Sequence, residues 1–251
     1  MELQHGEYMK EVSKETFTSG LIWKTANLVF SRGAAFFISI ILARKLEPDS
    51  FGLMSIWTVL LSLGNVFVIN GMDTLLVQKK DLNGQQRNAA FTGSVLRAGV
   101  FYLVFFYLAP YISDFYDTNL LKDLLRVAGI DFFSQCVITI FAAGAMRTMN
   151  FKKLTIIEIT SVIFSGSLSI LSVIWFQHWA LLLNVILHRM FVALFLLLTS
   201  KQKINFTKDL RGILSLTKDG IKIMMNSFCD MATGTLVGLF SMKKWDAASV
   251  G

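Results

Sequence analysis

Among the polar and charged side chains inside the long apolar segments of this 251-residue chain, seven are its candidates for chemistry. They are three arginines, two acids, a lysine and an asparagine: Arg32, Arg97, Arg189, Asp131, Asp230, Lys24 and Asn27. A charge at the centre of a membrane helix costs about 2.5–3.5 kcal/mol, so such residues usually face a protein interior or a water-filled cavity. Because guanidinium groups stay charged and donate paired hydrogen bonds to anionic oxygens, the pattern favours a cationic cavity that binds an anionic ligand.

Each of these residues also has a structural interpretation. An arginine or lysine inside a span can form an ion pair or extend its charged end to the membrane surface, and Lys24, near a helix end, suits the second interpretation. Asp131 and Asp230 could pair with the arginines, or one of them could carry a coupling proton or cation. The sequence leaves these alternatives open.

No other pattern in the sequence points to catalysis. There is no glycine-rich phosphate loop, no metal-ligand spacing and no nucleophile–base arrangement, and the short connections leave no room for a soluble catalytic domain. Cys136 and Cys229 both lie in apolar segments, which favours two free thiols. We therefore expect a protein that is not an enzyme and has no resident metal or cofactor.

The composition is typical of a membrane protein. Hydrophobic residues make up 54% of the chain and charged residues only 16%, against about 25% charged in soluble domains. The basic residues lie between the apolar segments, so the net charge of +7 predicts an orientation in a membrane and not a nucleic-acid partner. The connections on the N-terminal side hold most of these residues, which predicts a cytoplasmic N-terminus.

The predicted fold class is all-α, a polytopic membrane helix bundle, because backbone groups in lipid must form their hydrogen bonds internally. The seven expected spans are Thr18–Ala43, Phe51–Met72, Ala89–Ile112, Leu120–Met146, Leu154–Phe176, Trp179–Leu198 and Gly220–Phe240. They predict a cytoplasmic tail over 1–17, a six-helix lobe over 18–198, a basic cytoplasmic linker over 199–219, and the first helix of an incomplete second lobe over 220–251. In the linker, Leu210, Ile213, Leu214 and Leu216 are spaced as one face of a helix that lies on the membrane or joins two bundles.

Several short motifs occur in a characteristic order. They are LARKLEPDSFG at Leu42–Gly52, Gly71, LLVQKKDL at Leu75–Leu82, Phe91, FKKLTIIEI at Phe151–Ile159, HWALL at His178–Leu182 and FTKDLRGIL at Phe206–Leu214. In this order and spacing, over almost the whole chain, the sequence resembles the Wzx-type polysaccharide flippases of the multidrug/oligosaccharidyl-lipid/polysaccharide exporter superfamily. Such proteins are about twice as long, so the resemblance implies the N-terminal half of a flippase.

The resemblance implies a two-lobed helix bundle around a central cavity in the bacterial inner membrane. It implies alternating access that moves an undecaprenyl-diphosphate-linked oligosaccharide from the cytoplasmic to the outer leaflet, for O-antigen or exopolysaccharide biosynthesis. The implied partners are this lipid-linked oligosaccharide, membrane lipids, and the polysaccharide polymerase and export machinery.

Three other interpretations stay open. A multidrug exporter of the same superfamily would want an acidic cavity for cationic drugs, whereas the deep charges here lean towards an anionic cargo. A membrane-embedded glycosyltransferase or polymerase would need an acidic motif at a membrane face or a sizeable outer loop. A non-functional truncated remnant would fit the length as well as a flippase.

Overall fold

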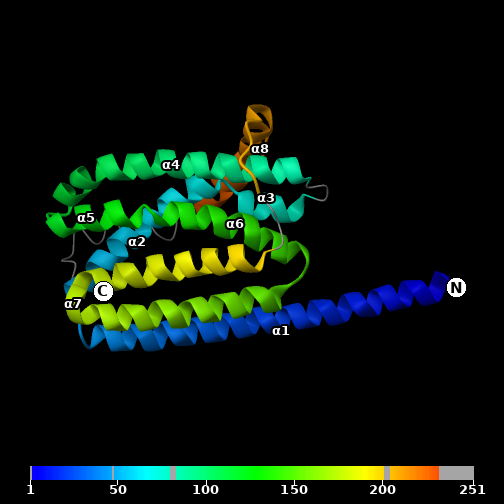
Figure 1. Cartoon of the computed structure of the whole chain (residues 1–251), viewed down its shortest axis with the longest axis horizontal. Helices are drawn as coiled ribbons and strands as arrows, with labels where there is room; N and C mark the ends of the chain where they lie inside the picture. The colour runs from blue at the N-terminus through cyan, green and yellow to red at the C-terminus, as the bar shows by residue number, and fades with distance from the viewer. Residues whose placement is uncertain (1, 47, 80–82, 201–203, 232–251) are drawn as a thin grey trace.

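The protein is a bundle of α-helices, and no strand occurs among the residues that the structure describes (Figure 1). The computed structural model describes residues 2–46, 48–79, 83–200 and 204–231, and within these ranges all side chains except those of 2–17, 48–49, 176–178 and 230–231. The helices are α1 (Glu2–Ala43), α2 (Pro48–Ile69), α3 (Met72–Gln78), α4 (Gly84–Phe115), α5 (Asn119–Ala128), α6 (Asp131–Arg147), α7 (Phe151–Thr199) and α8 (Leu210–Met231). The predicted all-α fold class is confirmed.

Within the described ranges, six helical segments are long and apolar enough to cross a membrane. They are Thr18–Ala43, Ser50–Ile69, Gly84–Phe115, Asn119–Arg147, Phe151–Trp175 and Trp179–Thr199. These segments correspond to the first six predicted spans, so the prediction of a multi-pass membrane helix bundle is confirmed. The predicted seventh span, Gly220–Phe240, begins within α8, and its residues from 232 onward lie outside the described residues.

Helix α7 contains two of these spans because it folds back on itself. A straight helix of its 49 residues would extend about 74 Å. Instead, Lys153 Nζ donates a hydrogen bond to the carbonyl oxygen of Thr199 at 2.8 Å, and Ser169 Oγ donates one to the carbonyl oxygen of Ala180 at 2.6 Å. Its halves therefore lie antiparallel (Figure 1). We call them the first limb and the second limb of α7: Phe151–Trp175 and Trp179–Thr199.

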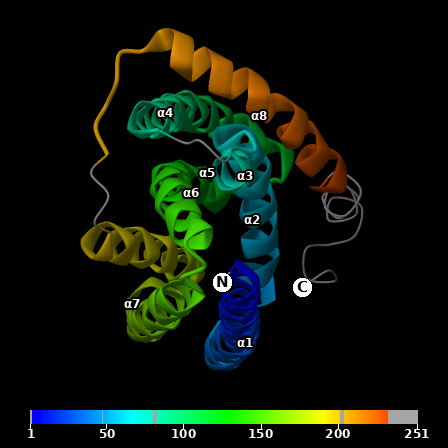
Figure 2. The same cartoon turned by 90° about the vertical axis from the view of Figure 1, so that its right-hand side faces the viewer.

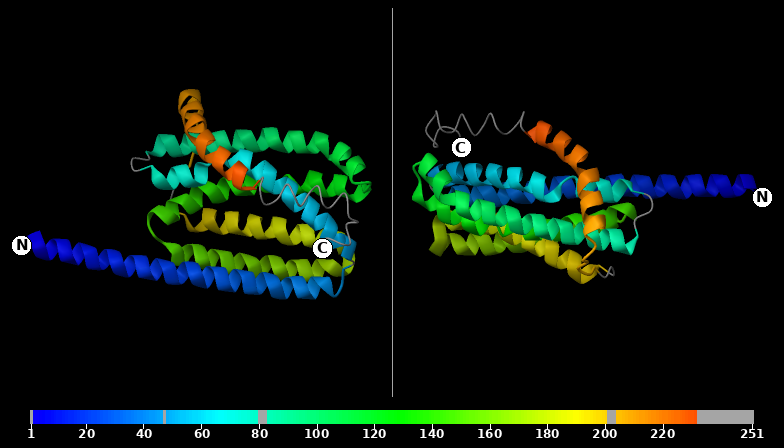
Figure 3. Two further views of the ribbon diagram at one scale, coloured as in Figure 1. Left: turned by 180° about the vertical axis from the view of Figure 1, so that it is seen from behind. Right: turned by 90° about the horizontal axis from the view of Figure 1, so that it is seen from above.

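The bundle is layered, with α1 along the α7 hairpin, α6 on the inner side of that hairpin, and α4 beyond α6 (Figure 2). The largest apolar cluster joins α2, α4, α5 and α6 around Trp57, Leu125 and Phe132, each at most 1% exposed. In contrast, α1 exposes Phe36 and Phe37, and its N-terminal part extends beyond the other helices (Figure 3). Because α1 contacts the bundle mainly through α7, one of its faces borders open space.

A sharp break separates α2 from α3. Asn70 and Gly71 both adopt positive φ angles, 50° and 65°. Glycine adopts this backbone region readily, and asparagine tolerates it better than most residues. The break turns the side chain of Asn70 towards α8, where its Nδ2 donates a hydrogen bond to the carbonyl oxygen of Thr217 at 2.8 Å.

Helix α8 crosses over α4 and contacts α2 and α3 near this break (Figure 2). It is continuous through residue 220, where the sequence predicts the second lobe to begin. Ile213 and Leu216 are buried, whereas Leu210 and Leu214 are exposed. The four residues that the sequence spaces along one face of a helix thus divide into two packed and two exposed side chains, and the packed face of α8 continues from Ile213 and Leu216 to Gly220.

Gly220 generates a stability prediction. A Cβ atom at this position would collide with the carbonyl oxygen of Asn70. Gly220→Ala should therefore separate α8 from the α2–α3 break and lower the free energy of unfolding by about 1–3 kcal/mol, despite the higher helix propensity of alanine. Thermal unfolding of the purified full chain in detergent measures this loss. Gly33→Ala is the matched control because its Cβ meets no atom within 4 Å. Equal melting temperatures for Gly220→Ala and the parent would contradict this packing.

Candidate functional site

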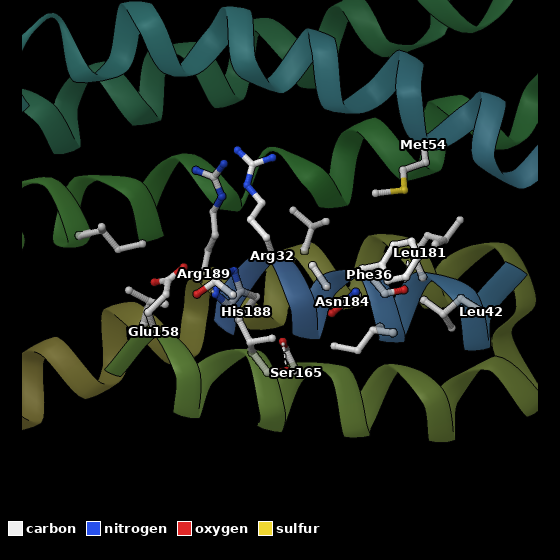
Figure 4. Close-up of a pocket in the computed structure, with 18 of the residues that line it drawn as sticks. Arg32, Phe36, Leu42, Met54, Glu158, Ser165, Leu181, Asn184, His188 and Arg189 are labelled. Carbon is white, nitrogen blue, oxygen red and sulfur yellow. Dashed lines mark hydrogen bonds and ion pairs between the residues drawn. The ribbon is translucent and has the colours of Figure 1, made fainter. Parts of the chain in front are cut away.

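A cavity of about 760 Å³ lies between α1, α6 and the α7 hairpin, with residues of α2 at one end (Figure 4). We call it the central cavity. Its polar lining consists of Ser31, Arg32, Ser39, Gln135, Glu158, Ser165, Asn184, His188 and Arg189. The rest of the lining is largely apolar. The volume falls within the range of about 300–1,000 Å³ that is typical of ligand-binding cavities.

Two of the predicted arginines line this cavity together. Arg32 comes from α1 and Arg189 from the second limb of α7, and their guanidinium groups point in the same direction, towards α6 (Figure 4). Among the described residues, none forms a hydrogen bond or an ion pair with Arg32. Its full charge is therefore available to a ligand in the cavity.

Arg189 is already partly engaged. Its Nε lies 3.4 Å from Asp131 Oδ1, and its Nη1 donates a hydrogen bond to Gln135 Oε1 at 2.6 Å. The arginine side chain is still 34% exposed, while that of Asp131 is 1% exposed. Arg189 therefore contacts a buried carboxylate on one side and borders the central cavity on the other.

Two features of the fold stabilise the buried carboxylate of Asp131. Asp131 is the first residue of α6, directly after the break at Gly129 and Ile130 that separates α5 from α6. The positive end of the α6 dipole favours a carboxylate at this position. Asn65 on α2 adds a hydrogen bond, with its Nδ2 donating to Asp131 Oδ2 at 3.1 Å. The sequence leaves two roles open for Asp131, pairing with an arginine or carrying a coupling ion. The geometry supplies the partner for the first role, Arg189.

A contact between a carboxylate and an imidazole joins the two limbs of α7. Glu158 Oε1 on the first limb lies 3.3 Å from His188 Nε2 on the second, and both side chains are partly exposed to the central cavity. The hairpin makes this contact possible, because it places the two limbs of α7 side by side and antiparallel. The rings of Phe164 and Phe191 meet across the limbs in the same way, with centroids 5.8 Å apart.

Lys24 and Asn27 line a neighbouring cavity of about 680 Å³. We call it the end cavity because it lies near the end of α6 and the start of α7, beside Met146 and Phe151. Asn27 Oδ1 accepts a hydrogen bond from Ser31 Oγ at 3.1 Å, and Ser31 in turn lines the central cavity. Four of the predicted residues, Lys24, Asn27, Arg32 and Arg189, thus border two adjoining cavities.

Arg97 lies apart from both cavities. Its guanidinium donates hydrogen bonds to the carbonyl oxygen of Val68 at 3.1 Å, to Thr217 Oγ1 at 3.0 Å and to Ser94 Oγ at 3.0 Å. These contacts tie α4 to the last turn of α2 and to α8. Asp230 lies near the end of α8, and its side chain is outside the described part of the structure.

The structure also adds residues that the predicted site did not contain. Gln135 binds Arg189, and Glu158 and His188 face each other in the cavity wall. The short connection between the fifth and sixth predicted spans indicates that the two limbs are antiparallel neighbours, but it does not by itself pair residues 158 and 188. The sequence offered Asp131 as a partner for one of the arginines without saying which, and it did not indicate the hydrogen bond between Gln135 and Arg189.

The chemistry of these groups is that of binding. In the part of the chain that the structure describes, no three His, Cys, Asp or Glu side chains come close enough to hold a metal ion. Arg32 and Arg189 can donate charge-assisted hydrogen bonds to phosphate or carboxylate oxygens, and the serine and asparagine side chains can bond to hydroxyl groups. The central cavity is thus suited to a ligand that combines an anionic group with hydroxyl groups.

Comparison with known proteins gave one match. A family model described as "Polysaccharide biosynthesis protein" matches residues 41–251. This range contains the α7 hairpin, Asp131 and Arg189, and begins after Arg32. Searches of curated protein sequences and of solved structures gave no significant match.

The pairing of Asp131 with Arg189 predicts a coupling between their substitutions. Arg189→Ala leaves a buried carboxylate without its cation, which should lower the free energy of unfolding by about 3 kcal/mol. Adding Asp131→Asn removes that charge, keeps an acceptor for Asn65, and should recover about 1–3 kcal/mol of the loss. Thermal unfolding of the two single variants and the double variant gives the coupling. The control for the second change is Asp123→Asn, since Asp123 is exposed. Additive losses would argue against the ion pair.

Proposed function

Because the chain belongs to the polysaccharide biosynthesis protein family, we propose that it translocates an undecaprenyl-diphosphate-linked oligosaccharide across the bacterial inner membrane by alternating access, as a transporter and not as an enzyme. The observation that carries this proposal is the central cavity, in which Arg32 and Arg189 present two guanidinium groups within a membrane-spanning bundle. The resemblance of the sequence motifs to Wzx-type flippases supports the same substrate.

The site chemistry suits the two parts of such a substrate. A diphosphate carries oxygens that accept hydrogen bonds from guanidinium groups, and a sugar offers hydroxyl groups to Ser31, Ser39 and Asn184. A cationic drug would need an unpaired acid, whereas Asp131 is paired with Arg189 and Glu158 lies beside His188. The charges therefore favour an anionic cargo over the multidrug alternative. In this proposal, the product is passed on to polysaccharide polymerase and export machinery.

The distribution of basic residues supports a cytoplasmic location for one end of the bundle. One side of the bundle holds the start of α4, the end of α6, both ends of α7 and the start of α8 (Figure 1). The basic residues on this side are Lys79, Arg87, Arg147, Lys152, Lys153, Lys208, Arg211 and Lys218. The opposite side holds fewer: Arg44, Lys45, Lys122 and Arg126. The positive-inside rule then assigns the first side to the cytoplasm.

This orientation can be tested by labelling single cysteines in intact cells. In a chain whose native cysteines are replaced, Asp123→Cys should react with a membrane-impermeant maleimide, because residue 123 is then on the outer side. Lys208→Cys should react only after the cells are permeabilised. Both positions are exposed. The reverse pattern would contradict the proposed orientation.

The transport proposal predicts a loss of surface polysaccharide when Arg32 is neutralised. The gene is supplied to a bacterial strain that lacks its own polysaccharide flippase, as the parent and as Arg32→Ala. Since a hydrogen bond to a charged group contributes about 1.5–3 kcal/mol, export should fall about tenfold or more at equal protein abundance. Surface polysaccharide is measured together with the level of the protein in the membrane.

Two variants control this experiment. Arg32→Lys keeps the charge and should retain part of the activity. Arg44→Ala removes an exposed arginine that directly follows the C-terminal end of α1 and lines neither cavity. Full activity in Arg32→Ala would show that Arg32 does not hold the diphosphate. Failure of the parent in several polysaccharide backgrounds would favour the multidrug exporter.

A further inference from the structure

The central cavity and the end cavity meet at a shared wall. Three side chains line both cavities: Ile138 from α6, Glu158 from the first limb of α7 and Val192 from the second limb. We call these three residues the partition. Two of them are apolar, so Glu158 is the polar element that both cavities have in common among their described lining residues.

Cations lie on both sides of the partition. Lys24 lines the end cavity, and Arg32 and Arg189 line the central cavity. Lys24 and Arg32 are eight residues apart on α1, which corresponds to about 12 Å along the helix. The carboxylate of Glu158, which both cavities share, therefore lies along the path from Lys24 to Arg32 through the two adjoining cavities.

Glu158 has a basic side chain as its neighbour. His188 Nε2 lies 3.3 Å from Glu158 Oε1, and the two side chains are 26% and 31% exposed. No charged side chain of α6 lines either cavity, since Asp131 is buried behind Arg189. The groups that set the potential at the partition are thus Lys24 and Arg32 on α1, and Glu158, His188 and Arg189 on α7.

We propose that Glu158, which lies beside His188, is a charge-selective gate between the end cavity and the central cavity, and that the anionic group of the substrate passes this gate between Lys24 and Arg32. The carboxylate in this shared wall repels an anion between two attractive positions and attracts a cation, and the imidazole beside it weakens this effect. This inference rests on the proposed function for the identity of the anion, but the gate itself is a property of the two cavities.

Charged thiol reagents test the gate without any transport assay. In the full chain with Cys136→Ala and Cys229→Ser, two reporter cysteines are introduced separately: Thr25→Cys in the end cavity and Ser39→Cys in the central cavity. Oriented membrane vesicles expose the side on which α6 ends and α7 begins. Anionic sulfonatoethyl and cationic trimethylammonioethyl methanethiosulfonate are added to that side. For each reagent, the measured quantity is the rate of cysteine modification at residue 39 divided by the rate of cysteine modification at residue 25.

The proposal fixes the sign of each change. Glu158→Gln should raise the relative rate of the anionic reagent about tenfold and lower that of the cationic reagent, because a fixed charge in a narrow path changes the local reagent concentration by about this factor. His188→Gln should have the opposite effect on both reagents. Glu158→Asp, which keeps the charge, should behave like the parent, and Asp123→Asn, which removes an exposed carboxylate outside both cavities, should change nothing.

The proposal of a gate is contradicted if the relative modification rates of the two reagents respond in the same way to the loss of the carboxylate. If Glu158→Gln changes both rates by the same factor, or neither, the partition does not select by charge. This outcome is distinguishable from failure of the proposed function. The reagents contain no sugar or lipid, so a charge-selective partition in a chain that restores no polysaccharide would retain the gate and reject the proposed substrate.

Discussion

A buried carboxylate determines how the central helices of this bundle fit together. Asp131 is 1% exposed inside a membrane-spanning segment, where an uncompensated charge is costly. Its compensation comes from three helices: Asn65 on α2, Arg189 on α7 and the N-terminal end of α6 itself. Because these groups must meet at one point, they fix the relative positions of α2, α6 and α7. The same demand occupies part of Arg189 and leaves Arg32 as the cavity cation without a partner among the described residues.

The sequence predicted those features of the fold that depend on the length of an apolar run. The six spans and the all-α class follow from run length, because hydrocarbon allows few alternatives for the backbone. Charged residues within the runs were a weaker guide. A charge in a span indicates that the side chain needs a partner, but it does not say which one. Arg32, Arg97 and Arg189 look equivalent in sequence, yet they are open to a cavity, bonded between helices and paired with an acid, respectively.

Arg97 shows why the remaining contacts could not be predicted. One of its acceptors is a backbone carbonyl, that of Val68, which has no signature in the side-chain sequence. Another is Thr217, 120 residues further along the chain. Both are within reach only because Asn70 and Gly71 break the helix and bring α8 close. The packed face of α8 could not be predicted for a similar reason. Its closest approach to the α2–α3 break is made by a glycine, Gly220, and not by its most hydrophobic residues.

The tight turn of α7 has a consequence for how the protein enters the membrane. Only residues 176–178 separate its two spans, so there is no connection long enough to let one span settle in lipid while the other waits in water. The two limbs form a single unit for the insertion machinery. Glu158 and His188 then leave water side by side, and their contact lowers the cost of transferring either group into hydrocarbon. The pair that lines the partition in the folded protein thus also assists the biogenesis of the hairpin that carries it.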